Sequence, residues 1–169
     1  MDLQFYIQQL SNSANAIHAV SQDVSDQQAR WKPDPASWSM LEVINHLYDE
    51  ERDDFRAHLQ GALQVPVAPF PSFDPQKWVT EHQYMEREFA PSLEDFMLER
   101  VNSLAYLKSL GEVNWQAAYD MPWGKLSAGD LMVSWAAHDL LHLRQLNELR
   151  YAYVDQITAP FSVKYAGEW

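Results

Sequence analysis

The sequence predicts an all-α protein, a four-helix bundle with a long connection between its second and third helices. Four segments repeat apolar residues every three or four positions, which is the spacing of one face of a helix. No segment shows a convincing alternation of apolar and polar residues, and the chain has only 5 glycines, so a turn-rich β fold is disfavoured. The length of 169 residues suits one core, and residues 1–169 are expected to form a single helical-bundle domain.

The first two predicted helices differ in how clearly their starts are marked. The first covers about residues 3–20, and the two prolines within residues 31–35 prevent any helix there. The second begins after Ser39, which can form a capping box with Glu42, and it ends near Gly61. In such a box the two residues satisfy each other's free backbone N–H groups.

The connection to the third helix is rich in proline over residues 65–75. Residues 76–89 are expected to form a helical turn or two, which Pro91 interrupts. Ser92, followed by an acid three positions later, is the predicted cap of the third helix, and Gly111 suits its end.

The fourth helix is predicted to start at another capping pair, Ser127 with Asp130, and to run to about Tyr153. Residues 119–125 before it are expected to form a turn, because they contain proline and glycine. The tail, residues 155–169, is expected to be irregular. Its aromatic residues are predicted to hold it against the bundle: Phe161, Tyr165 and Trp169.

Charge and composition exclude several classes of function. The formal net charge is -12, with 24 acidic residues against 12 basic ones, so the surface repels nucleic acids and anionic lipids. There are no cysteines, which excludes disulfides, thiolate metal ligands and a protein thiol nucleophile. No apolar run approaches the ~20 residues of a membrane span, and residues 1–4 do not resemble a signal peptide. A cytoplasmic location is expected.

Two histidines occupy the predicted core face of the fourth helix. At 100° per residue, His138 and His142 share an arc with Trp135 and Leu146, so they lie one turn apart on the seam of the bundle. Their Cβ atoms should be about 5–6 Å apart, which allows both rings to bind one ion. A metal-free network of buried imidazoles remains the alternative at this stage.

A third ligand has to come from another helix, and His46 is the best candidate. It lies at the margin of the apolar face of the second helix, beside Val43 and Glu50. Three neutral imidazoles would leave one coordination position open, as in catalytic zinc sites. Zinc is the expected ion, with nickel, iron or manganese as alternatives, because imidazole suits several divalent ions.

Two segments resemble the signature helices of the DinB-like (YfiT-like) four-helix-bundle proteins. They are residues 38–47, WSMLEVINHL, and residues 138–146, HDLLHLRQL. Trp115, the PWG turn at residues 122–124 and the helix opened by Ser127 also match the order of features in that family. The resemblance spans nearly the whole chain.

The resemblance implies a divalent metal held by His46, His138 and His142, and it implies a homodimer. It also implies a metal-dependent enzyme, such as a thiol S-transferase or a hydrolase, acting on a small molecule that could be a low-molecular-weight thiol. A non-catalytic, metal-stabilised bundle that serves as a stress-related interaction module is the alternative function. The apolar outer side of the fourth helix, which includes Val133 and Leu140, fits a dimer interface.

Other acids and histidines have weaker signals. Glu50 follows His46 by one turn and could act as a general base, although a solvated acid in a run of three acids is the competing interpretation. Asp139 takes the position of the glutamate in HExxH metalloproteases, but it is one methylene shorter, so protease activity is not expected. His58 and His82 are expected to be ordinary side chains.

Overall fold

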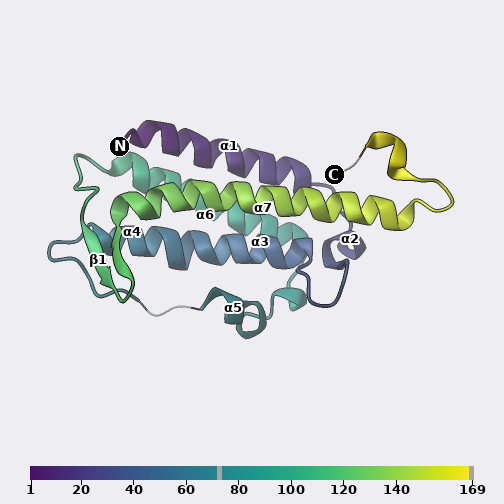
Figure 1. Ribbon diagram of the computed structural model, residues 1–169, viewed down its shortest axis with the longest axis horizontal. Coiled ribbons are helices and arrows are strands. Elements are labelled where there is room, and N and C mark those ends of the chain that lie inside the picture. Colours follow the sequence, from purple (N-terminus) through teal and green to yellow (C-terminus); the bar gives the residue numbers. More distant parts are fainter. Residues whose placement is uncertain (72–73, 168–169) are drawn as a thin grey trace.

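Four long helical rods lie side by side in the computed structural model, which describes residues 1–71 and 74–167 (Figure 1). The second rod is continuous but changes its winding from α to π and back to α. The rods are α1 (Leu3–Ser21), the run α3 (Met40–Asp49), η1 (Glu50–Phe55) and α4 (Arg56–Ala62), then α6 (Phe89–Ser109) and α7 (Ala128–Ile157). The shorter elements are α2 (Asp26–Arg30), α5 (Pro75–Glu81), η2 (Tyr84–Glu86), β1 (Ala118–Met121), β2 (Gly124–Ser127) and η3 (Val163–Ala166).

The predicted all-α bundle and its long connection are confirmed. Residues 63–88 link the second and third rods and contain only the short helices α5 and η2. Both predicted capping boxes are present: Ser39 and Glu42 exchange side-chain bonds with each other's backbone N–H at the start of α3. Ser127 and Asp130 do the same at the start of α7. Local sequence therefore fixes where two of the rods begin.

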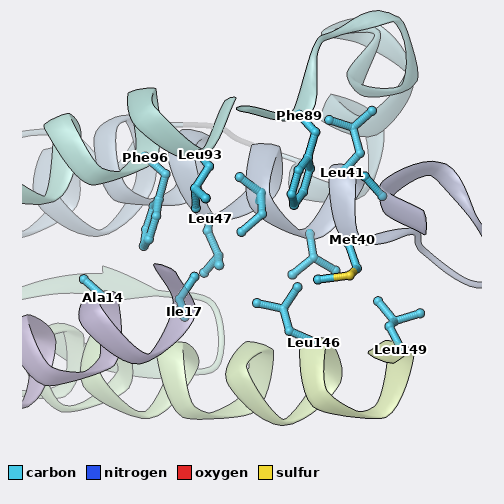
Figure 2. Packing of buried hydrophobic residues seen from close by; sticks show 13 residues of the cluster. Ala14, Ile17, Met40, Leu41, Leu47, Phe89, Leu93, Phe96, Leu146 and Leu149 are labelled. Carbon is cyan, nitrogen blue, oxygen red and sulfur yellow. The ribbon is translucent and has the colours of Figure 1, made fainter. Parts of the chain in front are cut away.

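Two clusters of buried apolar side chains hold the rods together, because α6 and α7 both pack between the other two rods. Helix α1 contacts α6 and α7, and α3 contacts the same pair. Figure 2 shows side chains from all four rods meeting in one of the two clusters, with Ile17 from α1, Leu47 from α3, Phe96 from α6 and Leu146 from α7. Each is at most 2% exposed, so their burial supplies the apolar free energy that holds the rods together.

The start of the third rod differs from the prediction. Helix α6 begins at Phe89, so Pro91 lies in its first turn, where the missing N–H has no intrahelical partner to lose. Ser92 is not the cap. Its hydroxyl donates to the Glu88 carbonyl at 2.8 Å and accepts from the Asn45 amide at 3.1 Å, which ties α6 to α3.

The expectation that no strand is present is wrong for one short segment. β1 and β2 form an antiparallel hairpin around the PWG turn. Gly124 has φ +139°, a conformation that favours glycine and that closes the two-residue turn. Each strand has four residues, too few for an alternating pattern to stand out from the sequence.

The tail also departs from the prediction. Phe161 is 82% exposed and Tyr165 is fully exposed, so neither holds the tail against the bundle, and Trp169 lies outside the described residues. Figure 1 shows that the end of α7 extends beyond the other rods and that the chain after it turns back from this projecting end. Over the described residues, none of the helices has the length and apolar character needed to cross a membrane.

Candidate metal centre

The structure brings His46, His138 and His142 together, although His46 is 92 residues from His138. The Nε2 atoms of His46 and His138 are 3.3 Å apart, and those of His138 and His142 are 3.1 Å apart. One ligand nitrogen from each ring lies within 4.8 Å of the others, so the three could hold one metal ion. Two nitrogens on a tetrahedral zinc ion are about 3.3 Å apart for Zn–N bonds of about 2.0–2.1 Å, so the observed spacings suit a shared ion.

Aromatic side chains fix the planes of these rings. Trp38 stacks parallel to His142 at a centroid distance of 6.3 Å and meets the edge of His46 at 4.8 Å. Phe55 contacts His138 at 5.0 Å. Rings that are held by packing lose little freedom on binding an ion, which favours a preorganised site.

Burial keeps all three imidazoles neutral. It lowers the pKa of His46 to about 2 and that of His138 to about 3, with a further contribution from the neighbouring histidines. Burial also lowers the pKa of His142, against the hydrogen bond to Gln145. At neutral pH the rings therefore carry free lone pairs, which metal ligation requires.

The cluster leaves two buried polar atoms without a hydrogen-bond partner in the described part of the chain: His46 Nδ1 and Glu50 Oε1. They face each other at 3.7 Å, which is too long for a hydrogen bond. A carboxylate behind a ligating imidazole is the usual outer partner of a metal-bound histidine. His142 has a comparable partner, since its Nδ1 lies 2.8 Å from Gln145 Oε1. The residues present thus fit a divalent ion held by three imidazoles.

The expectation of a solvated Glu50 is wrong, because Glu50 is only 4% exposed. Burial is the largest cause that raises the pKa of Glu50, which reaches about 10. The hydrogen bond to Asp54, the negative charge of Asp54 and the negative charge of Asp49 raise it further. Without a cation nearby, Glu50 therefore keeps its proton at neutral pH.

The π-helix η1 explains why a run of acids turns inward. Its six residues have wider i→i+5 hydrogen bonding than an α-helix, and such turns are frequent at functional sites. As a result Glu50, Glu51 and Asp54 are all buried. Asp49, just before η1, accepts a bond from Tyr84 at 2.7 Å and lies 2.6 Å from His82 Nδ1.

Two of the remaining histidines, His58 and His82, and Asp139 have other partners. His82 faces Asp49 rather than the histidine cluster, and His58 Nδ1 lies 2.5 Å from Asp54 Oδ1. Asp139 accepts two bonds from Arg100, at 2.7 and 2.9 Å, so it does not occupy the position of a metalloprotease base. Sequence spacing alone could not reveal these partners, because most of them come from distant segments.

The histidine cluster opens into a pocket of about 830 Å³. Its floor is formed by the three histidines, Glu50, Asp54 and Phe55. Its walls come from the loop before α3, the start of α5 and the later turns of α7: Pro33, Ala36, Ser37, Trp38, Pro75, Gln76, Gln145, Glu148, Leu149 and Ala152. A ligand in this pocket would therefore reach an ion on the histidines.

The sequence analysis did not identify Asp54, Gln145, Trp38 or Phe55 as members of the site. Gln145 carried a signal, since it follows His142 by three residues and so shares its face of the helix. Asp54 carried a similar signal, since it follows Glu50 by four residues, but its burial within a run of acids was not predictable.

Residues 9–146 match the family model of the DinB superfamily, and the chain belongs to this family. The predicted family is thereby confirmed. Among solved structures, the chain is similar to YfiT from Bacillus subtilis, with a TM-score of 0.77, 15% sequence identity, and coverage of 88% of this chain and 86% of YfiT. YfiT is described as a probable metal-dependent hydrolase with an unusual four-helix bundle topology. At this identity the similarity concerns the fold. No curated protein matches the chain significantly.

Proposed function

We propose that this protein is a metal-dependent enzyme, a thiol S-transferase or a hydrolase, that acts on a small molecule. One observation carries the proposal: three neutral imidazoles from two rods converge at the floor of an open pocket rather than in a closed core. Structural zinc sites are closed, whereas catalytic ones keep a position for water or substrate. His46, His138 and His142 are the proposed ligands, and zinc is the proposed ion, with nickel, iron or manganese as alternatives.

A divalent ion at this position would act as a Lewis acid and lower the pKa of a water or thiol that binds it. The chain has no cysteine, so any thiol must enter as a substrate. Trp38 and Phe55 hold the imidazole planes beside this open pocket. The pocket volume lies within the range of small-molecule sites.

Glu50 has two roles in this proposal. As a carboxylate, it would accept a hydrogen bond from His46 Nδ1–H once the 3.7 Å between the two atoms closes on metal binding, and this bond would fix the tautomer whose Nε2 lone pair faces the other histidines. It also lines the pocket, where its carboxyl group can hold the proton that an incoming water or thiol releases. Burial raises the pKa of Glu50, which favours proton uptake.

The test is elemental analysis of protein purified without a histidine tag, together with His142→Ala. About one ion per chain is expected in the unmodified protein and a large loss in the variant, since one of three ligands is removed. An unchanged metal content in His142→Ala would contradict the proposed ligand set.

Cobalt substitution separates an enzyme from a metal-stabilised interaction module. In a catalytic site, an added thiol should change the visible spectrum of the bound cobalt, because a ligand position is open. In a structural site the spectrum should stay constant, and removal of the metal should only lower the melting temperature. An unresponsive spectrum would favour the module.

A homodimer belongs to the same proposal. Val133, Leu140 and Leu141 of α7 are 45–56% exposed, so this helix presents apolar side chains to solvent as well as to the core. Sedimentation should show a dimer that Leu140→Glu converts to a monomer; a monomeric unmodified protein would contradict this part.

A further inference from the structure

The pocket is lined by acids and by no lysine or arginine from the described residues. Glu50 and Asp54 lie at its floor, with side chains 5% and 11% exposed. Glu148 is the most exposed acid of the lining, with a side chain 44% exposed, and the end of the pocket at Glu148 is called its mouth. Between them the wall includes the apolar residues Trp38 and Leu149, which reduce the screening of charge by water.

The cations nearest to the pocket in sequence are engaged elsewhere. Lys32 Nζ lies 2.8 Å from Glu42, and Lys77 Nζ lies 3.1 Å from Asp74. Arg56 pairs with Glu99 and donates to Ser103, and Arg150 donates to the Val20 carbonyl. Arg144 approaches Glu148 from outside the pocket at 3.2 Å, but its side chain is 68% exposed. Such an exposed pair contributes little free energy, so Glu148 can exchange Arg144 for a ligand at small cost.

The two ends of the pocket therefore favour opposite charges on a ligand. At the floor, a divalent ion would attract an anionic ligand atom such as a thiolate. At the mouth, a carboxylate would meet Glu148 and would find no basic side chain of the lining to compensate it. Repulsion between Glu148 and a ligand carboxylate would weaken the binding of carboxylates and so make the pocket specific for other ligands.

We propose that the pocket selects small molecules that carry an ammonium group, with Glu148 as the counter-ion at the mouth, and discriminates against carboxylates at that end. The inference rests on the proposed function, because the other end of the ligand is placed on the metal ion. Glu148 follows His142 by six residues, which is about 9 Å along the helix. Glu148 is also turned about 120° around the helix axis from His142, so a chain of about six carbons matches the axial part of the separation.

The test compares 6-aminohexane-1-thiol with 6-mercaptohexanoate on the cobalt-substituted protein. The two probes have the same length, and their terminal charges are too far from the sulfur to change its acidity much. Titration followed by the visible cobalt spectrum gives a dissociation constant for each. We expect the ammonium thiol to bind at least about fivefold more tightly, within the range of a half-exposed charge pair.

Substitutions of Glu148 test whether this residue causes the preference for the ammonium thiol. Glu148→Gln should remove most of the ratio of the two dissociation constants, and Glu148→Lys should reverse it. Glu112→Gln is the matched control: it changes the net charge equally, but Glu112 is exposed and does not line this pocket. Its ratio should equal that of the unmodified protein.

The outcomes separate the two proposals. A protein that binds no cobalt would refute the proposed function, and this inference with it. Normal cobalt binding with tighter binding of the carboxylate thiol, or with the same ratio in all variants, would overturn this inference alone. If neither probe changes the spectrum, the open coordination position and this inference both fail.

Discussion

Two buried polar clusters lie between the second rod and α7, and they differ in whether their hydrogen bonds are complete. Arg100 donates to Glu51 at 2.7 and 2.8 Å, to Asp139 at 2.7 and 2.9 Å, and to the Leu10 carbonyl at 2.6 Å. Trp135 Nε1 donates to Glu51 at 2.9 Å. Every member of this cluster is paired, and none lines the main pocket.

The histidine cluster is the opposite case. His138 is the sequence neighbour of Asp139, yet it faces two other imidazoles at the floor of a pocket. His46 Nδ1 and Glu50 Oε1 have no hydrogen-bond partner within the described ranges. A complete buried network supports the fold, whereas an incomplete one that opens to a pocket is suited to a ligand that completes it. Each prediction below tests this contrast.

The largest effect is expected for Arg100→Met. It would leave the carboxylates of Glu51 and Asp139 buried without a cation, which typically costs about 3–5 kcal/mol of unfolding free energy. Urea denaturation measures the loss. Arg144→Met is the control, since the exposed pair with Glu148 should contribute under about 1 kcal/mol. Equal losses in the two variants would contradict the role assigned to Arg100.

His138→Leu should behave differently from Arg100→Met. In metal-free protein we expect a change of less than about 1 kcal/mol, because a buried ring is replaced by an apolar group of moderate size. Zinc at 100 times its dissociation constant should stabilise the unmodified protein by about 2.7 kcal/mol and the variant by much less. Melting curves with and without zinc test this; a variant that zinc still stabilises fully would exclude His138 as a ligand.

Glu50→Gln should weaken metal binding by about 10- to 100-fold while the fold is retained, as for other outer partners of ligating histidines. The amide cannot accept the proton or carry the negative charge that balances the ion. Competition with a chromophoric chelator measures the affinity. Glu112→Gln serves as the control of equal charge change and should bind metal normally.

The same variant should change the pH dependence of the metal-free protein. The pKa of Glu50 is raised from 4.5 to about 10, so between these values the folded state holds a proton that the unfolded chain has released, and stability falls as pH rises. The lowered pKa values of His46 and His138 act oppositely, but only below about pH 6.5. From about pH 7 to 9 the unmodified protein should therefore lose stability more steeply than Glu50→Gln.

The smallest effect is expected for Gln145→Leu. Gln145 Oε1 fixes His142 through its Nδ1, but Gln145 is half-exposed, so water can replace it in part. A loss of metal affinity of about tenfold or less is expected, at the lower limit for such outer partners. A loss as large as that of Glu50→Gln would show that the two outer partners are equivalent.

The sequence by itself determined the helical rods and two of their starts. Apolar spacing and capping boxes are local signals, so Ser39 with Glu42 and Ser127 with Asp130 were predictable from a few residues. The spacing of His138 and His142 was equally local, because one helical turn sets it. The position of His46 was a hypothesis, since helix pairing is not encoded in any single segment.

Only the tertiary structure decided what surrounds these residues. The π-helix turned Glu50, Glu51 and Asp54 inward, although a run of acids is usually solvated. It is accommodated because Arg100 and Trp135, from distant positions, supply partners for Glu51. His58, one turn along the same rod, lies 2.5 Å from Asp54. A run of acids in the sequence shows that burying them would cost free energy. It does not show which cation or hydrogen-bond donor, often distant in the sequence, offsets that cost. For that reason the pocket, and the acids that line it, became visible only in the folded molecule.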